Sequence, residues 1–478
     1  MSGKMLFRKL LIIISLFFFI TNISAQKKVI NIEDAIRVAL DNNNQVKISI
    51  MEVEKAEAAV REAFGYALPT VNLSANYSRL IEKPQMPFPD FEALLTNATY
   101  GILFKEGVIP QDNSKYLPLQ TKLQSFAQTN NYEAKAEIVQ ILFNSAVFRG
   151  IGTSQIYLDL SREMLKSSVA NTVLNVKKAF YGVLLTKNIL EITKASYDNA
   201  QENLKNVKAY YEQGFVSEFD ALQAEVQVEN IRPVVLQIEN TLKNVKNNLK
   251  IVLGINQSED LDVEGELIYS EELIPDMMDA IETALTSNYD IKSIKMKREV
   301  DEAFVDLDRA DYYPNLAAFG SYSYSGSADD FKFNNYSTAM VGLSFSINLF
   351  RGTQTKNRVQ QAMISVKQTD EQISQLKDYV SVQVKAKVLE LERVKSVIQA
   401  QERNVKLAQR AYEIATVRYK EGTGSQLEIQ NSDIALRQAK TNMLQSIYDY
   451  ISSRSELDQL LGSVKDEYIS FAQQKVQK

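Results

Sequence analysis

The chain contains no cysteine, histidine or tryptophan, and only 17 of its 478 residues are glycine. Without cysteine it can form no disulfide bond and carry neither a thiol nucleophile nor a lipid-modified cysteine. Without histidine, zinc sites and Ser-His-Asp triads lose their usual ligand and base. The sequence also shows no clustered acid, base and nucleophile. We therefore expect no enzyme, no cofactor and no bound metal.

Neither sign of charge dominates, because the chain has 54 basic and 59 acidic residues, which gives a formal net charge of -5. No basic stripe is interleaved with aromatic residues, so we expect no nucleic-acid partner. What remains is rich in alanine, leucine, glutamate, lysine and glutamine. With little glycine to interrupt it, this composition favours long helices.

The N-terminus has the pattern of an export signal. Basic residues from Lys4 to Lys9 precede an apolar run from Leu10 to Ile20, and the small-residue stretch "TNISA" ends at Ala25. The apolar run has roughly 11 residues, whereas about 20 are needed to span a bilayer. The sequence therefore predicts a signal peptide over residues 1–25, with a retained membrane anchor as the alternative.

An internal repeat runs through the rest of the chain. The segment Asp34–Ser78 aligns without a gap on Asp279–Ser323, and "YEQGFVSEFDAL" aligns on "YKEGTGSQLEIQ", each block later closing in "LG". Self-similarity at a fixed spacing indicates a duplicated structural unit. We expect a first repeat over 26–254, a linker over 255–276, a second repeat over 277–462 and a polar C-terminal tail over 463–478.

Each repeat has the same order of predicted parts: a helix of roughly 30 residues, a strand, a loop, a strand, a very long helix, a sharp turn and a return helix. Proline cannot continue a helix, so Pro69 and Pro314 mark the helix-to-strand turns. Glycine permits tight bends, so Gly150 and Gly352 mark the strand-to-helix turns.

The long helices set the dimensions. The helical pattern after Gly352 holds for roughly 65 residues, which is about 100 Å, and it ends in coiled-coil spacing at Val405, Ala408 and Tyr412. The return helix from Ser425 covers only about half of that distance. We expect the opening helix of the other repeat to supply the missing half, so that the helices form a hollow barrel.

The strand segments alternate with period 2. In "MVGLSFSINLF", Val341, Leu343 and Phe345 share one face, while Leu142 and Phe319 break the alternation in other copies. One interpretation is a soluble antiparallel sheet on a core. We favour membrane strands that are apolar outward and polar inward, because the polar face is mostly serine, asparagine, glycine and threonine. Four strands cannot close a barrel, so several copies must share one.

The loop over residues 80–131 is unusual, because it holds five of the nine prolines while the matching second loop is short. Long loops without secondary structure are uncommon in compact domains and are either functional or disordered. We interpret this loop as an extracellular lid or plug, with a disordered surface loop as the alternative.

The opening "INIEDAIRVALDNN", the helix-to-strand segment "EAFGYALPTVNLSANYS", the strand-to-helix segment "INLFRGTQTKNRV" and the two hairpins resemble the outer membrane efflux protein family, the TolC-like channels. The resemblance implies a mainly α fold with transmembrane β structure: a homotrimer whose chains each give four strands to a twelve-stranded outer-membrane barrel above a periplasmic α-helical barrel. The implied location is the outer membrane of a Gram-negative bacterium, in contact with its lipid.

The function that the resemblance implies is a passive exit duct for efflux or type I secretion. Its implied partners are a periplasmic adaptor protein, which docks on the helical tips, and an inner-membrane transporter. A non-conducting envelope scaffold, anchored in the outer membrane by a β-barrel, is an alternative of a different class.

The resemblance also implies site residues. Transferred onto this sequence, the adaptor-docking tips are Gly214, Phe215, Val216 and Ser217 in the first repeat and Gly422, Thr423, Gly424 and Ser425 in the second. Their residue types have a simpler explanation as well, because glycine permits a tight reversal and serine caps the helix that follows.

Members of the family often carry acidic side chains just past the second turn, where they narrow the closed aperture. Glu428 fits that pattern, but one turn later the chain has Asn431, and Asp220 and Gln223 occupy the matching places in the first repeat. We expect a weakened acidic ring from Glu428 with Asp220 nearby. The alternative is that these are ordinary acids favoured at helix starts by the macrodipole.

Overall fold

The computed structural model describes residues 28–476, so the predicted signal peptide over 1–25 lies outside the described residues. The chain forms two compact units, each drawn from both repeats. The helical unit takes in the chain up to Arg61, Gly152–Val305 and the chain from Val359 onward, and the strand unit comprises Glu62–Ile151 and Asp306–Arg358. Among the described residues, no helix combines the length and apolar character needed to cross a membrane.

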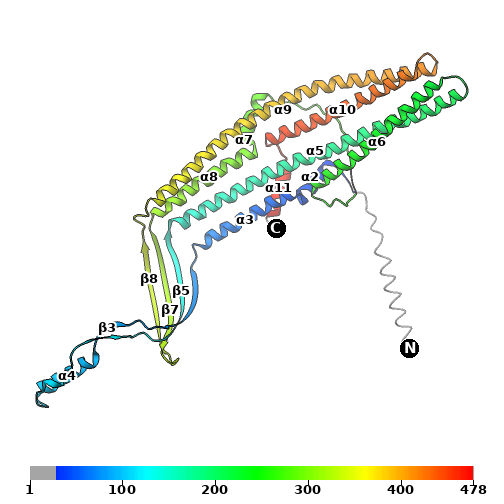
Figure 1. The fold of residues 1–478 in the computed structure, drawn as a ribbon. Coiled ribbons are helices and arrows are strands. Elements are labelled where there is room, and N and C mark those ends of the chain that lie inside the picture. Colours follow the sequence, from blue (N-terminus) through cyan, green and yellow to red (C-terminus); the bar gives the residue numbers. More distant parts are fainter. Residues whose placement is uncertain (1–27, 477–478) are drawn as a thin grey trace, which may run out of the picture. The chain divides into compact units, whose positions relative to one another are not determined.

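Two very long helices dominate the helical unit. They are α5 (Ser145–Glu212) and α9 (Gln354–Lys420), with 68 and 67 residues. Each turns sharply and returns as a shorter helix, α6 (Glu218–Leu253) after α5 and α10 (Gln426–Leu460) after α9 (Figure 1). The long helices and their shorter return helices agree with the lengths that the sequence indicates. Gly352 lies in the turn before α9, as predicted, but Gly150 lies inside α5, so the predicted strand-to-helix turn at Gly150 is wrong. The turn falls earlier because Asn144 caps α5, its side-chain oxygen accepting from the backbone N–H groups of Ala146 and Val147 at 2.9 and 3.1 Å.

The opening helix of each repeat is broken in two, which the sequence pattern did not predict. The first is α2 (Ile32–Asn42) and α3 (Asn44–Gly65), and the second is α7 (Met277–Ser287) and α8 (Tyr289–Arg309). Asn43 and Asn288 stand at the breaks. Each caps the helix that follows through its side-chain oxygen, which accepts from the backbone N–H of Gln45 or Asp290 at 2.8 and 2.9 Å.

The same two asparagines join each opening helix to a return helix. The Asn43 amide donates to the Val252 carbonyl at 2.8 Å, and the Asn288 amide donates to the Leu460 carbonyl at 3.0 Å. Both bonds lie within one repeat. The expectation that the other repeat supplies the missing half of the return path is therefore wrong: α3 meets the end of α6, and α8 meets the end of α10.

A small set of elements covers one side of α5, and we call it the collar: α2, α11 (Asp466–Val476), and the parallel pair β1 (Lys28–Ile30) and β6 (Leu261–Val263). Val169 and Val173 of α5 are buried in one cluster with collar residues such as Ile36 and Ala472. The linker thus contributes a strand, and the tail that the sequence analysis treats as polar forms a helix with a buried face.

The strand unit is built on one antiparallel sheet in the order β2-β5-β7-β8. Its strands are β2 (Thr70–Arg79), β5 (Asn130–Asn144), β7 (Asn315–Ala328) and β8 (Asn334–Ser346). Val71, Ile138, Gly320 and Val341 lie opposite one another across the four strands, so one face is apolar, as the alternation predicts. The part of the chain that the structure describes leaves this face uncovered, and Val341 is 87% exposed.

Both exceptions to the alternation have a structural cause. The register of β5 against β7 shifts between Ile141 and Phe143, so Leu142 is the extra residue of a β-bulge and Phe143 returns to its place opposite Leu316. Phe319 lies on the polar face against Gly342, where an added Cβ would come within 2.7 Å of its ring. Because Gly342 has no Cβ, the Phe319 ring can occupy the space that a larger residue would fill.

The long first loop folds into a small excursion from the sheet, which we call the insertion (residues 80–129). It contains β3 (Met86–Pro89), α4 (Phe91–Lys105), a 3-10 turn (Asn113–Lys115) and β4 (Thr121–Gln124), with β3 antiparallel to β4. Asp90 caps α4 and forms an ion pair with Lys122 at 2.5 Å. The insertion has its own secondary structure, which distinguishes it from a disordered loop.

Candidate functional site

The two hairpin turns have closely similar geometry. Gly214 and Gly422 adopt φ angles of +78° and +76°, the left-handed region that other residues avoid. In the first turn the Phe215 N–H donates to the Tyr210 carbonyl at 2.9 Å. In the second turn the Thr423 N–H donates to the Arg418 carbonyl, also at 2.9 Å. The predicted tip residues therefore do form the two tight reversals.

The residues after each turn cap the return helices. Ser217 and Asp220 form a reciprocal capping box, with Asp220 accepting from the Ser217 N–H and Ser217 accepting from the Asp220 N–H, both at 3.2 Å. Ser425 accepts from the Glu428 N–H at 3.3 Å. Capping accounts for these serines, while the Phe215 side chain is 74% exposed and has no role inside the chain's own core.

The residues predicted to line the aperture are only partly available to do so, because some of them contact neighbouring side chains or are half-buried. The Glu428 carboxylate lies 3.1 Å from one terminal guanidinium nitrogen of Arg418, and the other terminal nitrogen donates to the Thr423 carbonyl at 3.0 Å. Asn431 is exposed and Gln223 is half-buried. Sequence reasoning missed Arg418, because it stands ten residues before Glu428 and becomes its neighbour only when the turn closes.

Tyr419 was also missed, although it links the two hairpins. It packs beside the buried cluster of Val207, Ala221 and Ala224 from the first hairpin, and its hydroxyl is buried without a hydrogen-bond partner. Burial, followed by the nearby Asp220 carboxylate and Tyr210, raises the pKa of Tyr419. Tyr419 continues the coiled-coil spacing of Val405, Ala408 and Tyr412, so the sequence pattern indicates only a helix seam at this position.

A buried carboxyl group lies farther along the same helices. The Ser196 hydroxyl of α5 donates to the Asp433 carboxylate of α10 at 2.6 Å, and Asp433 is only 6% exposed. Burial raises the pKa of Asp433 above its ordinary value of 3.8, against the opposing effects of the Ser196 hydrogen bond and of Arg437 and Lys440. Burial and then Asp433 itself raise the pKa of Tyr412 on α9.

This arrangement predicts a pH-dependent seam between α5 and α10. A raised folded-state pKa means that Asp433 stabilises the seam most at low pH and that this contribution is lost as the pH rises through the folded pKa. We expect amides of α10 near Asp433 to exchange hydrogen faster at about pH 8 than at about pH 4, near the ordinary pKa of the group, after correction for intrinsic rates. Asp433→Asn should remove that difference, whereas Asp449→Asn on the same helix should not. An unchanged profile in Asp433→Asn would contradict the assignment.

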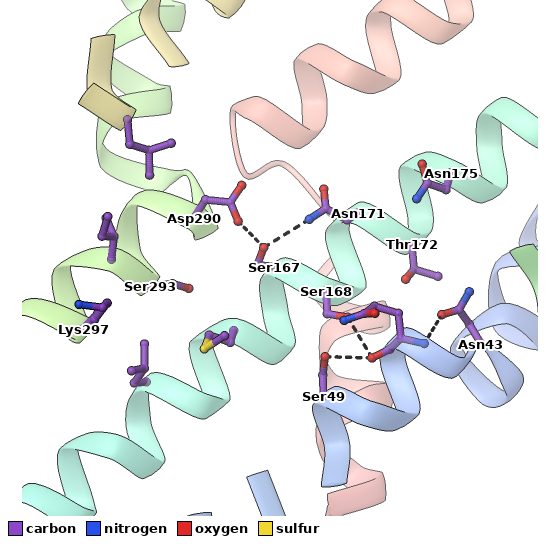
Figure 2. Close-up of a pocket in the computed structure, with 15 residues that line it drawn as sticks. Asn43, Ser49, Ser167, Ser168, Asn171, Thr172, Asn175, Asp290, Ser293 and Lys297 are labelled. Carbon is purple, nitrogen blue, oxygen red and sulfur yellow. Dashed lines mark hydrogen bonds between the residues drawn. The ribbon is translucent and has the colours of Figure 1, made fainter. Parts of the chain in front are cut away.

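A cavity of about 620 Å³ opens among α3, α5 and α8 in the helical unit (Figure 2). Its polar lining comes largely from hydroxyl and amide side chains such as Ser167 and Asn171, with one carboxylate, Asp290, and one ammonium, Lys297. Asp290 accepts a hydrogen bond from Ser167, which in turn accepts one from Asn171 at 3.4 Å. Among the described residues, no group of three or more acidic side chains is placed to hold a metal ion.

The cavity lies on a definite side of α5. Ser167 and Asn171 stand two residues away from Val169 and Val173, which places them on roughly the opposite face of a helix with 3.6 residues per turn. The valine face packs against the collar. Helix α5 therefore has one face sealed by the collar and one that is polar and open.

Comparison with known proteins agrees with this architecture. A family model described as outer membrane efflux protein matches residues 35–255 and 280–463. The chain is 22% identical to the outer membrane protein TolC of Vibrio cholerae over 62% of this chain and 68% of that protein, and 22% identical to the alkaline protease secretion protein AprF of Pseudomonas aeruginosa over 71% of each.

The fold itself is similar to that of a solved channel. The crystal structure of the Campylobacter jejuni CmeC outer membrane channel superimposes with a TM-score of 0.71, covering 94% of this chain and 89% of that chain at 16% identity. At that identity the likeness concerns the fold alone. The family model, in contrast, matches both repeats and most of the sequence. The chain therefore belongs to the outer membrane efflux protein family.

Proposed function

We propose that three copies of this chain form one duct through the outer membrane, a passive exit for substrates that an inner-membrane pump delivers through a periplasmic adaptor. The open sheet carries the proposal. Within residues 28–476, its edge strands β2 and β8 have no neighbour on their outer sides, and Leu73 and Val341 on its apolar face are 82% and 87% exposed. Backbone groups in lipid must all be paired, so β8 of one copy pairs with β2 of the next.

The opposite face of the sheet suits water. Glu133, Lys135 and Glu137 of β5 lie on it, next to small polar residues such as Ser74 and Ser323, and Lys135 forms an ion pair with Glu137 at 3.1 Å. Twelve strands, four from each copy, enclose a wider interior than eight, whose side chains nearly fill the space. A charged inner face and an apolar outer face are the pattern of membrane strands around an aqueous channel.

The helical unit, taken by itself, also has one covered face and one polar face. With the collar outside, the polar face of α5 that carries Ser167 and Asn171 lines the interior. The turns Gly214–Ser217 and Gly422–Ser425 are the adaptor-docking tips in this proposal, with Phe215 as the exposed apolar contact. The duct needs no catalytic group, because the partner complex supplies the energy.

In-cell photo-crosslinking tests the assignment of the tips. A photoreactive amino acid at position 217 or 425 should capture a periplasmic adaptor, whereas the same group at Ser258, an exposed residue outside the tips, should not. Recovering no periplasmic partner from either tip would overturn the proposed docking. A purified trimer that conducts no ions in planar bilayers, with no growth defect toward toxic compounds on deletion, would favour the envelope scaffold instead.

The aperture proposal gives a separate prediction. Arg418 partly neutralises Glu428, so we expect Arg418→Gln to increase the block of single-channel current by Mg²⁺, and Glu428→Gln to reduce that block. Each trimer carries three such sites, which multiplies the change in local charge. Glu421→Gln, an exposed acid before the turn, is the control. Currents of Glu428→Gln trimers that match the wild type in their block by Mg²⁺ would exclude Glu428 from the aperture.

A further inference from the structure

Helix α4 of the insertion exposes an apolar stripe. Phe91, Leu95, Ala98 and Ile102 follow one another at spacings of 4, 3 and 4 residues, which is the a/d spacing of a coiled-coil seam. All four are exposed, with Leu95 and Ile102 at 64% and 62%. We call this stripe the α4 seam.

The other side of α4 is already occupied. Ala93 is fully buried, Asn97 exchanges two hydrogen bonds with the Leu117 backbone at 2.7 and 2.8 Å, and Phe104 packs edge-on against Tyr116 with ring centroids 5.8 Å apart. These contacts hold α4 in a fixed orientation on the rest of the insertion. These contacts therefore keep the α4 seam facing outward.

The residues beside the seam permit association with an identical helix. In the register set by Leu95 as position a, the flanking e and g positions are Glu92, Leu94, Thr99, Gly101 and Glu106. In a parallel arrangement Leu94 meets Thr99 and Gly101 meets Glu106, so no two like charges face each other. Ala98 and Gly101 are small and allow close approach of the helices.

The insertion also stands where copies meet. It leaves the sheet after Arg79, the last residue of edge strand β2, and re-enters at Asn130 of β5. Lys83 anchors its start to Asp329, in the turn between β7 and β8, with an ion pair of 2.6 Å. In the proposed trimer, β2 borders the next copy, so three insertions are tethered around one mouth.

From the seam, its flanks and its place at the subunit edge, we propose that the α4 seams of the three copies pack against one another across the exit and close it as a lid of three identical helices. The proposal rests on the trimer proposed above. A helix of 15 residues is marginal alone, but tethering at one mouth raises the effective concentration to roughly the millimolar range.

A lipid surface is the rival occupant of this seam. Helices that lie in a membrane interface oppose their apolar face with a polar one rich in lysine and arginine. The opposite face of α4 is instead packed on the insertion, and the helix carries a single basic residue, Lys105, at its end. These features favour identical helices over lipid as the partner.

Single cysteines test the lid, because the chain has none of its own. In outer-membrane trimers, Ala98→Cys should form a disulfide between two copies on mild oxidation, while the exposed Gln111→Cys of the same insertion should not. Oxidised Ala98→Cys channels should lose their bilayer current and regain it on reduction. Leu95→Asp combined with Ile102→Asp should instead increase the current.

The outcomes separate this inference from the function on which it rests. If trimers assemble and conduct but Ala98→Cys links no more than Gln111→Cys, the lid is excluded and the duct stands. If a fluorophore on Ala98→Cys is quenched by quencher-labelled lipid, the seam lies on the membrane and the lid is likewise excluded. If no trimer forms, the proposed function itself falls.

Discussion

Val341→Lys is expected to leave almost no trimer in the outer membrane. Val341 lies on the apolar face of edge strand β8 and is 87% exposed, so in the proposed assembly it faces lipid near the middle of the strand. A lysine near the bilayer midplane of a membrane strand costs about 2–4 kcal/mol, and every trimer carries it three times. Heat-resistant trimer in purified outer membranes, measured by gel mobility before and after boiling, is the readout.

The matched control is Thr338→Lys on the same strand. Thr338 pairs with Ser323 on the polar face, where a lysine meets water and lies on the same side as Glu137. We expect this variant to assemble normally and to shift only the ion preference of the channel. Equal loss of trimer in both variants would contradict the assignment of the two faces.

Gly254→Ala and Gly462→Ala are expected to destabilise the helical unit strongly. Their φ angles are +69° and +67°, and an added Cβ would lie 2.3 Å from the Asn42 carbonyl oxygen and 2.4 Å from that of Ser287. The left-handed backbone alone costs an alanine about 1–2 kcal/mol, and the contact with a backbone atom adds to this. Thermal unfolding of the purified protein should therefore begin at a clearly lower temperature.

Gly152→Ala provides the comparison, because it lies inside α5 and an added Cβ would meet nothing within 4 Å. There alanine should stabilise the helix by about 0.5–1 kcal/mol. If all three variants unfolded at the same temperature, the close junctions at Gly254 and Gly462 would not hold the opening and return helices together. Asn43→Ala and Asn288→Ala remove the side-chain hydrogen bonds of the same junctions. The unfolding temperatures of these variants should lie between those of Gly254→Ala and Gly462→Ala and that of Gly152→Ala.

The parts that depend on local pattern could be predicted from the sequence. The alternation in "MVGLSFSINLF" places Val341 on the apolar face, and a helical pattern of roughly 65 residues anticipates α9. The pattern also indicated a sharp glycine-containing turn between each long helix and its return helix, while the assignment of these turns as docking tips came from the family resemblance and stays a prediction. Because the two repeats align without a gap, a segment with a clear pattern in one repeat also identifies the matching segment with a less regular pattern in the other.

The parts that depend on contacts between distant segments could not be predicted. Asn43 caps α3 locally, but its amide also donates to the Val252 carbonyl, more than 200 residues away, and that contact has no local signal. The linker becomes a strand because β1 pairs with β6, and Arg418 becomes the neighbour of Glu428 only across a closed turn. For the same reason the sequence assigned the missing half of the return path to the wrong repeat.

The central claim is that one chain cannot close its own sheet, so that three copies share a single wall. Native mass measurement of the purified mature protein in detergent tests this most directly, combined with hydrogen exchange of the edge strands. We expect a mass of three chains and strong protection of β2 and β8, because their outer backbone groups pair between copies. A folded monomer that stays in water without detergent, with both edge strands exchanging freely, would contradict it.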